Sequence, residues 1–102
     1  MDFEWDKNKN SMNIRKHKID FADIPMMFEK SMLVQYDNRQ DYSEDRWIGI
    51  GLLRDIVAVV VFTERDNNTI RIISARKANK NEKKQYYEKI IQNRLGKTGR
   101  DE

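Results

Sequence analysis

The sequence contains no cysteine, which excludes a disulfide framework, a thiolate zinc site and a cysteine nucleophile. Its one histidine, His17, rules out a multi-histidine metal site but still allows a serine-type triad. No apolar run approaches the roughly 18 residues of a membrane-spanning helix, and the acidic segment 1–6 lacks the apolar stretch of a signal peptide. We therefore expect a soluble, cytoplasmic protein that binds no metal ion and no cofactor.

With 102 residues the chain has room for one compact domain. Isoleucine, leucine, valine and phenylalanine together number only 24, so the core is modest, whereas charged residues reach 36% of the chain. A core of this size gives a marginally stable domain unless a partner covers part of it. We predict a single domain over residues 1–96 and a frayed polar tail over residues 97–102.

The excess of positive charge lies in the last third of the chain. Residues 71–102 carry ten basic and four acidic side chains, and a second basic cluster lies between Lys7 and Lys18. A basic surface attracts phosphate groups and speeds encounter with nucleic acid. A solvated face that only aids solubility explains the charge equally well, so charge alone leaves both interpretations open.

Hydrophobic spacing predicts an α+β fold, a small antiparallel sheet with helices packed on one face. The expected strands are residues 3–5, 32–36, 46–53, 56–65 and 69–76, of which the last four form a meander with 56–65 at the centre. A first helix is expected from a cap at Asp6 to about Lys16. A second, short helix is expected from a cap at Asp23, with Pro25 in its first turn.

Local signals refine this fold. Gly49 and Gly51, two residues apart on one strand, predict that another part of the chain comes close to the backbone there. Asn79 and Glu82 have the spacing of a capping box, which begins a last helix. Gly96 is expected to end that helix.

Three charged clusters are candidates for chemistry. The first, Arg15–Lys18, ends the first helix, where the helix dipole alone already favours cations. The second, Thr63–Arg65, ends the central strand, where paired charges are usually solvated. The third, Ile70–Lys77, sets arginine beside isoleucine on both faces of a strand. Metal-free phosphate chemistry is open to these residues, but no cluster is a motif by its spacing alone.

Taken together and in this order, the clusters resemble the BrnT family of toxins from prokaryotic type II toxin–antitoxin systems. The resemblance covers roughly residues 3–87 and is carried by Phe3–Asp6, Lys9, Asn13, Arg15–His17, Phe21, Phe28, Glu44–Trp47, Gly51, Val59–Arg65, Ile70–Ala78, Glu82 and Tyr86. The string Arg-Ile-Ile-Ser-Ala-Arg-Lys-Ala, before a charged helix, is quite specific. The family pattern usually has glycine after the Lys-His pair; here Lys18 stands there and takes a left-handed conformation only at a cost of about 1 kcal/mol.

The resemblance implies a RelE-like fold and a ribonuclease that arrests growth by cutting RNA. It also implies a partner, the antitoxin BrnA, which has a ribbon-helix-helix DNA-binding part, and a complex that represses its own operon. Contact with DNA would then be indirect, through the antitoxin. Two alternatives stay open: a non-catalytic module that keeps the toxin fold and binds protein or nucleic acid, and a weaker one, a stand-alone DNA-binding regulator.

Cutting RNA through its own 2′-hydroxyl needs a base, an acid and positive charge around the scissile phosphate. The catalytic candidates are His17, Glu64, Arg71 and Arg76, and the RNA-binding candidates are Lys16, Arg46, Arg65 and Lys77. Histidine suits proton transfer because it titrates near pH 6.5, and Glu64 either rivals it or orients an arginine.

The two catalytic arginines raise a geometric question. Five residues separate Arg71 from Arg76, so in a regular strand they point to opposite faces. Either a bulge near Ser74 brings them to one face, or only one of them meets the substrate. Arg76, near the strand end and the start of the last helix, is then the better candidate.

Overall fold

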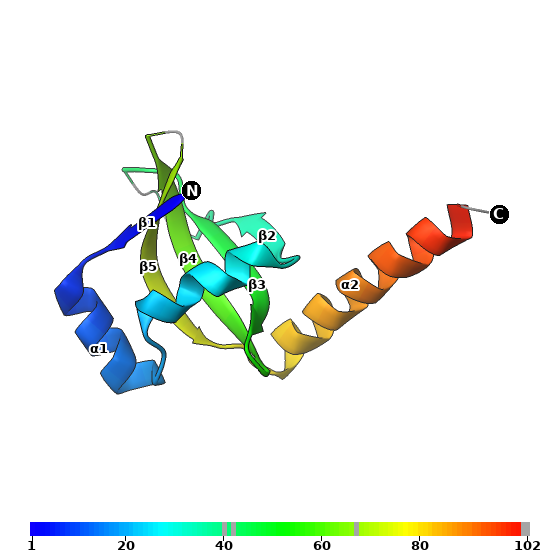
Figure 1. The fold of residues 1–102 in the computed structure, drawn as a ribbon, viewed down its shortest axis with the longest axis horizontal. Helices are drawn as coiled ribbons and strands as arrows, with labels where there is room; N and C mark the ends of the chain where they lie inside the picture. Colours follow the sequence, from blue (N-terminus) through cyan, green and yellow to red (C-terminus); the bar gives the residue numbers. More distant parts are fainter. Residues whose placement is uncertain (40, 42, 67, 101–102) are drawn as a thin grey trace.

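The computed structural model describes residues 1–39, 41, 43–66 and 68–100, the stretch 94–100 by its backbone alone. Over these residues the chain forms one five-stranded sheet with helices around it (Figure 1). In chain order the elements are β1 (Asp2–Trp5), α1 (Lys7–His17), the 3-10 helix η1 (Phe21–Glu29), β2 (Leu33–Tyr36), β3 (Trp47–Leu53), β4 (Ile56–Arg65), β5 (Thr69–Lys77) and α2 (Lys80–Arg100). Every expected strand is present to within one residue, which confirms the α+β class.

The strand order is β1-β5-β4-β3-β2, so β4 lies at the centre, as its continuous apolar run predicts. Strands β2 to β5 form the expected antiparallel meander. Arg54 and Asp66 take left-handed backbone angles, with φ of 57° and 50°, at two of its turns. The first strand, β1, instead runs parallel to β5, so the sheet is mixed.

Apolar side chains cover both faces of the sheet, which corrects the expectation that the helices share one face. On one face, η1 and the residues before it pack on alternate residues of β4, and Phe21 and Ile24 are fully buried there. On the opposite face, Tyr86 of α2 packs with Val57 and Val59. Since β4 is apolar on both sides, both sides must be shielded from water.

The last helix, α2, covers only one end of this second face and then projects away from the sheet (Figure 1). Its projection gives a radius of gyration of 14.7 Å, above the about 13 Å expected for a compact chain of this length. Gly96 does not end the helix as expected, because α2 continues to Arg100. One interior glycine lowers helix stability by only about 1 kcal/mol. The expected domain boundary between residues 96 and 97 falls inside α2 and stays a prediction.

The glycines of β3 admit a close neighbour, as expected. A Cβ atom on Gly51 would lie 2.7 Å from Cγ of Met32, and one on Gly49 would lie 3.3 Å from Sδ of the same methionine. The absence of both side chains therefore lets Met32 and Met27 pack directly against the strand.

The short helix η1 begins earlier than expected. Its cap is Asp20, not Asp23, because the Asp20 carboxylate accepts a hydrogen bond from the Ala22 N–H. The earlier start follows from burial of Phe21, whose N–H donates to the side chain of Asn10 at 2.8 Å. Pro25 accordingly lies inside the helix and not in its first turn.

Candidate nucleic-acid interface

The open face, as we define it, is the part of the α2 side of the sheet that α2 leaves uncovered. It carries Glu4 of β1, Arg65 of β4, three residues of β5 (Arg71, Ser74 and Arg76), and Arg46, which directly precedes β3. A bulge decides this composition: the pairing of β4 with β5 shifts between Val61 and Phe62, which leaves Ile73 as an extra residue in β5. The extra residue reverses the alternation, so both catalytic arginine candidates share the open face. This is the first of the two alternatives that the sequence leaves open.

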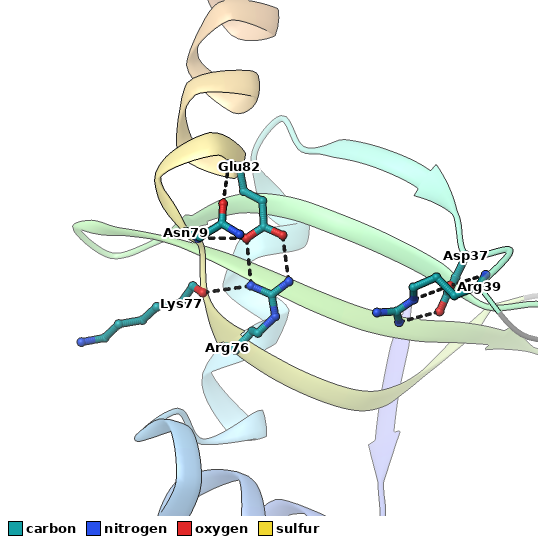
Figure 2. A network of polar contacts seen from close by, with 6 residues as sticks. All are labelled: Asp37, Arg39, Arg76, Lys77, Asn79 and Glu82. Carbon is teal, nitrogen blue, oxygen red and sulfur yellow. Dashed lines mark hydrogen bonds and ion pairs between the residues drawn. The ribbon is translucent and has the colours of Figure 1, made fainter.

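Arg76 is held by the first turn of α2 (Figure 2). Its Nη1 and Nη2 donate to the two carboxylate oxygens of Glu82, each at 2.8 Å, and Nη1 also donates to the Lys77 carbonyl at 3.2 Å. Glu82 in turn accepts from the Asn79 N–H at 2.9 Å and donates its own N–H to Asn79 at 2.8 Å, which confirms the capping box. Hydrogen bonding between the two side chains raises the pKa of Arg76 and lowers the pKa of Glu82.

The bonds to Glu82 and Lys77 leave Arg76 able to bind an anion. A guanidinium has five N–H donors, and these bonds use three of them. The other two, on Nε and Nη2, lie along one edge of the guanidinium plane, in the fork geometry that grips two oxygens of a phosphate. The side chain is 42% exposed, so solvent and ligands can reach it.

A second guanidinium faces Arg76 across the open face. Arg39 donates from Nε and Nη2 to the two oxygens of Asp37, at 2.8 and 2.9 Å, and the Asp37 side chain is fully buried. Figure 2 shows the Arg39 side chain reaching along the sheet toward Arg76. The positive charge of Arg39 lowers the pKa of Arg76, although by less than Glu82 raises it. Each guanidinium is paired with a carboxylate, so the two ion pairs together add no net charge, and the N–H donors of Arg76 that its bonds leave unused are what an anion would meet here.

Further cations lie at the other end of the open face. Arg71 and Arg65 share the carboxylate of Glu4, at 3.0 and 3.6 Å. Nε of Arg46, a partly buried residue, lies 3.9 Å from Glu44. One carboxylate therefore serves two arginines at Glu4, and a second carboxylate, that of Glu44, faces Arg46.

The remaining basic candidates lie near the edge of β5. The helix α1 packs along this edge because the Asn13 side chain accepts a hydrogen bond from the Ala75 N–H at 3.1 Å. His17, which is half-buried, lies one helical turn further along the same face of α1. Lys16 and Lys77 are exposed.

Lys18 ends α1 in the manner of the glycine that it replaces. Its backbone is left-handed, with φ 63° and ψ 29°, and its N–H donates to the Ile14 carbonyl at 2.9 Å. The helix therefore ends at His17.

Glu64 stands apart from the arginines. The alternation of β4 puts it on the face of Phe62, as expected, and that face is opposite to the open face. It also lies five residues along β4 from Val59, the partner of Arg76, a separation of about 17 Å. It lines a hollow of about 580 Å³ together with Glu44, Asp45, Trp47, Thr63, Arg65 and Asp66. Four carboxylates and one guanidinium, that of Arg65, therefore line this hollow.

Sequence reasoning missed two residues that lie beside the open face, and one role. Asp37 and Arg39 belong to a polar stretch without periodicity, where no pattern predicts that the side chains return to the sheet. The Asp-x-Arg spacing was the available signal, because it allows a local ion pair. Glu82 was recognised as a capping residue, whereas its bond to Arg76 depends on the angle at which α2 leaves β5.

The described residues contain neither a cluster of metal ligands nor a membrane-spanning helix. Within them, no group of three or more histidine, aspartate or glutamate residues is placed to hold a metal ion. Likewise, no helix in the described part of the chain is both long and apolar enough to cross a membrane.

The family comparison and the comparison with solved structures agree with each other. Residues 5–82 match the family model described as the ribonuclease toxin, BrnT, of type II toxin–antitoxin systems. Among solved structures, the chain is similar to the Brucella abortus ribonuclease toxin BrnT, known from a 1.1 Å crystal structure. The two share 30% sequence identity and superpose with a TM-score of 0.65, over 78% of this chain and 99% of the Brucella chain. A search of curated protein sequences finds no match.

Proposed function

The chain belongs to the BrnT family of ribonuclease toxins of type II toxin–antitoxin systems, and from this premise we propose where and how it cuts RNA. RNA is bound on the open face and cleaved in the cytoplasm without a metal ion. A BrnA-like antitoxin neutralises the toxin by covering that face. The coarser statements, an RNA target and an antitoxin partner, follow from the family itself.

The bulge in β5 carries this proposal. Attack of the 2′-hydroxyl on the adjacent phosphate builds negative charge on the non-bridging oxygens, which fixed cations can offset. Because Arg71 and Arg76 share one face, a single RNA strand can meet both. Arg76 is the group we assign to the scissile phosphate, since Glu82 fixes its orientation and its free edge is a bidentate fork. Arg39 supplies a second cation, and Arg46, Arg65 and Arg71 bind flanking phosphates.

We assign proton transfer to His17. It ends the helix that borders the Arg76 end of β5, whereas Glu64 lies on the opposite face of the sheet. Lys16, next to the histidine in α1, and Lys77, at the end of β5, add positive charge at this end of the sheet. Glu64 then has no direct part in the reaction.

The experiment is a cleavage assay of the purified toxin on single-stranded RNA, with and without EDTA. We expect Arg76→Ala and His17→Ala to lower kcat at least about 100-fold while circular dichroism stays unchanged. Arg54→Ala is the matched control, because Arg54 is also an exposed arginine in a carboxylate pair, with Asp23, yet lies outside the site. Activity of the wild type should survive EDTA.

Three results would contradict parts of this scheme. Activity that vanishes with EDTA and returns with magnesium would refute metal independence. Full activity in both alanine variants would refute the assigned residues. A wild type that binds RNA but never cuts it would favour the alternative of a non-catalytic binding module.

A further inference from the structure

The helix α1 turns polar side chains, and not apolar ones, toward the rest of the protein. Of its eleven residues, each of which the structure describes, three are not exposed: Asn10, Asn13 and His17. They follow one another at spacings of three and four residues, so they lie on one face of the helix. The apolar residues Met12 and Ile14 are instead 64% and 39% exposed. Burial of large apolar side chains is therefore not what holds α1 against the sheet.

Directional hydrogen bonds hold α1 instead, and Asn13 makes two of them with one amide. Its side-chain oxygen accepts from the Ala75 N–H at 3.1 Å, and its side-chain nitrogen donates to the Ile19 carbonyl at 2.9 Å. Asn13 is buried, so both bonds lie in a low-dielectric interior, where they are stronger than in water. Because hydrogen bonds depend on distance and angle, this amide fixes both the position and the orientation of the end of α1.

The two bonds of Asn13 reach the chain beside both residues that we assign to the reaction. Ala75 immediately precedes Arg76 in β5. Ile19 follows His17 by two residues. His17 itself lies one turn after Asn13, about 6 Å further along the helix axis at 1.5 Å per residue. The chain before and after His17 is therefore tied, through one amide, to the backbone next to Arg76.

The His17 side chain ends this face of α1 without a bond of its own. It is half-buried, yet no hydrogen bond or ion pair joins its imidazole to the residues that the structure describes. Both ring nitrogens are thus available to a ligand, as proton transfer requires. The place of the ring is set by the helix that carries it, and hence by the bonds of Asn13.

We propose that Asn13 is a positioning residue for RNA cleavage, which sets the place of the His17 imidazole relative to the Arg76 guanidinium. The inference rests on the proposed function, because it needs both residues to act on the same phosphate. Catalysis depends steeply on geometry, and a misplacement of about 1 Å can lower a rate about 100-fold. Asn13 touches no reacting atom and acts through His17.

Asn10 provides a matched control on the same face of the same helix. It also makes two bonds with one amide, since it accepts from the Phe21 N–H at 2.8 Å and donates to Asp20 at 3.0 Å. These bonds tie α1 to the start of η1 and not to β5. A variant of Asn10 therefore loses the same kind of stabilising bond but leaves the link between His17 and Arg76 intact.

The test is the cleavage assay of the full-length toxin, with each rate divided by the folded fraction from circular dichroism. Asn13→Ala removes both bonds, and Asn13→Asp removes only the N–H that donates to Ile19. We expect both variants to lower kcat at least about tenfold, with KM within about twofold of the wild type because the arginines still bind the RNA. Asn10→Ala should keep kcat within about twofold. If Asn13→Ala does not fold, Asn13→Asp carries the comparison, because it keeps the acceptor for the Ala75 N–H.

A double-mutant cycle shows whether Asn13 acts through the histidine. In a chain that already carries His17→Ala, Asn13→Asp should change kcat by less than about twofold, because no imidazole is left to position. An asparagine that only stabilises the fold leaves kcat per folded molecule unchanged in both backgrounds. One that acts on Arg76 alone lowers kcat by the same factor in both.

The outcomes separate this inference from the proposed function. A fall in kcat that is confined to the Asn13 variants and absent in the His17→Ala background supports the inference. If His17→Ala lowers kcat but the Asn13 and Asn10 variants behave alike, or if the effects of Asn13→Asp and His17→Ala multiply, the inference is refuted while the function stands. If His17→Ala keeps full activity, the assignment of His17 in the proposed function fails, and the inference fails with it.

Discussion

Glu82 performs two tasks with one carboxylate. It closes the capping box at the start of α2, and it holds the guanidinium of Arg76 with two bonds of 2.8 Å. The cap explains why α2 begins directly after β5, and the ion pair explains why Arg76 has one orientation. The same residue thus joins the stability of a helix to the geometry of the proposed site.

The pH dependence of stability should reveal this carboxylate. Because its pKa is lowered from 4.5, Glu82 contributes stability that is fully present above about pH 4.5 and is lost as pH falls through the lowered value. Glu82→Gln keeps the capping geometry but removes the charge, so we expect a loss of about 1 kcal/mol in the free energy of unfolding at pH 7.

Urea denaturation from pH 3 to pH 8 measures this effect. The difference in the free energy of unfolding between the wild type and Glu82→Gln should be constant near neutral pH and should shrink below about pH 4.5. Glu88→Gln, an exposed change on the same helix, should show no such trend. An equal difference at pH 3 and pH 7 would mean that the ion pair with Arg76 does not stabilise the protein.

At the scale of elements, α1 shows how tertiary contacts outweigh helix propensity. Its asparagines are poor helix formers, yet two of them hold the fold together. Asn10 bonds to Asp20 and to the N–H of Phe21, and Asn13 bonds to the Ile19 carbonyl and the Ala75 N–H. β1 pairs with β5 only as far as Ile72. At Ala75, further along the same edge, the Asn13 side chain accepts the backbone hydrogen bond that a neighbouring strand would otherwise accept.

Removal of the Asn13 amide should be strongly destabilising. Asn13 is 6% exposed, and Asn13→Ala leaves a buried N–H and a buried carbonyl without their partner. We expect a loss of roughly 2–4 kcal/mol in the free energy of unfolding, measured by urea denaturation. Asn8→Ala, an exposed asparagine of the same helix, is the control and should be neutral or slightly stabilising. Equal effects of the two changes would show that the Asn13 bonds contribute nothing.

At the scale of the whole molecule, the sheet is covered unequally. One face is closed by η1, whereas α2 closes only part of the other and projects from it (Figure 1). The uncovered part is the open face, with its cluster of arginines. A protein built in this way has a surface ready for an anionic ligand or for an acidic partner segment.

The antitoxin should therefore bind tightly and stabilise the toxin. We expect the product of an adjacent ribbon-helix-helix gene to elute with the toxin as one peak on gel filtration. The antitoxin is expected to bind only the folded toxin. Free antitoxin at 100 times Kd therefore adds about 2.7 kcal/mol to the toxin's free energy of unfolding and raises its Tm by several degrees. Separate peaks and an unchanged Tm would contradict the pairing.

The sequence by itself determined the strands, the cap of α1, the capping box of α2 and the family. Strand positions follow from the alternation of apolar residues, and caps follow from side chains that bond to backbone only three residues away, so both are local in the chain. Recognition of the family likewise needed only motifs and their order along the chain, of which the string before α2 is the most specific.

The tertiary structure decided what depends on residues far apart in the chain. Only the pairing of β4 with β5 determines whether Ile73 is an extra residue, and hence whether Arg71 and Arg76 share a face. Only the packing of the segment after β2 brings Arg39 toward Arg76, and only the angle of α2 brings Glu82 there. Register and side-chain direction depend on contacts between elements that local periodicity does not specify, so the sequence supplied the charged residues and the fold selected which of them meet.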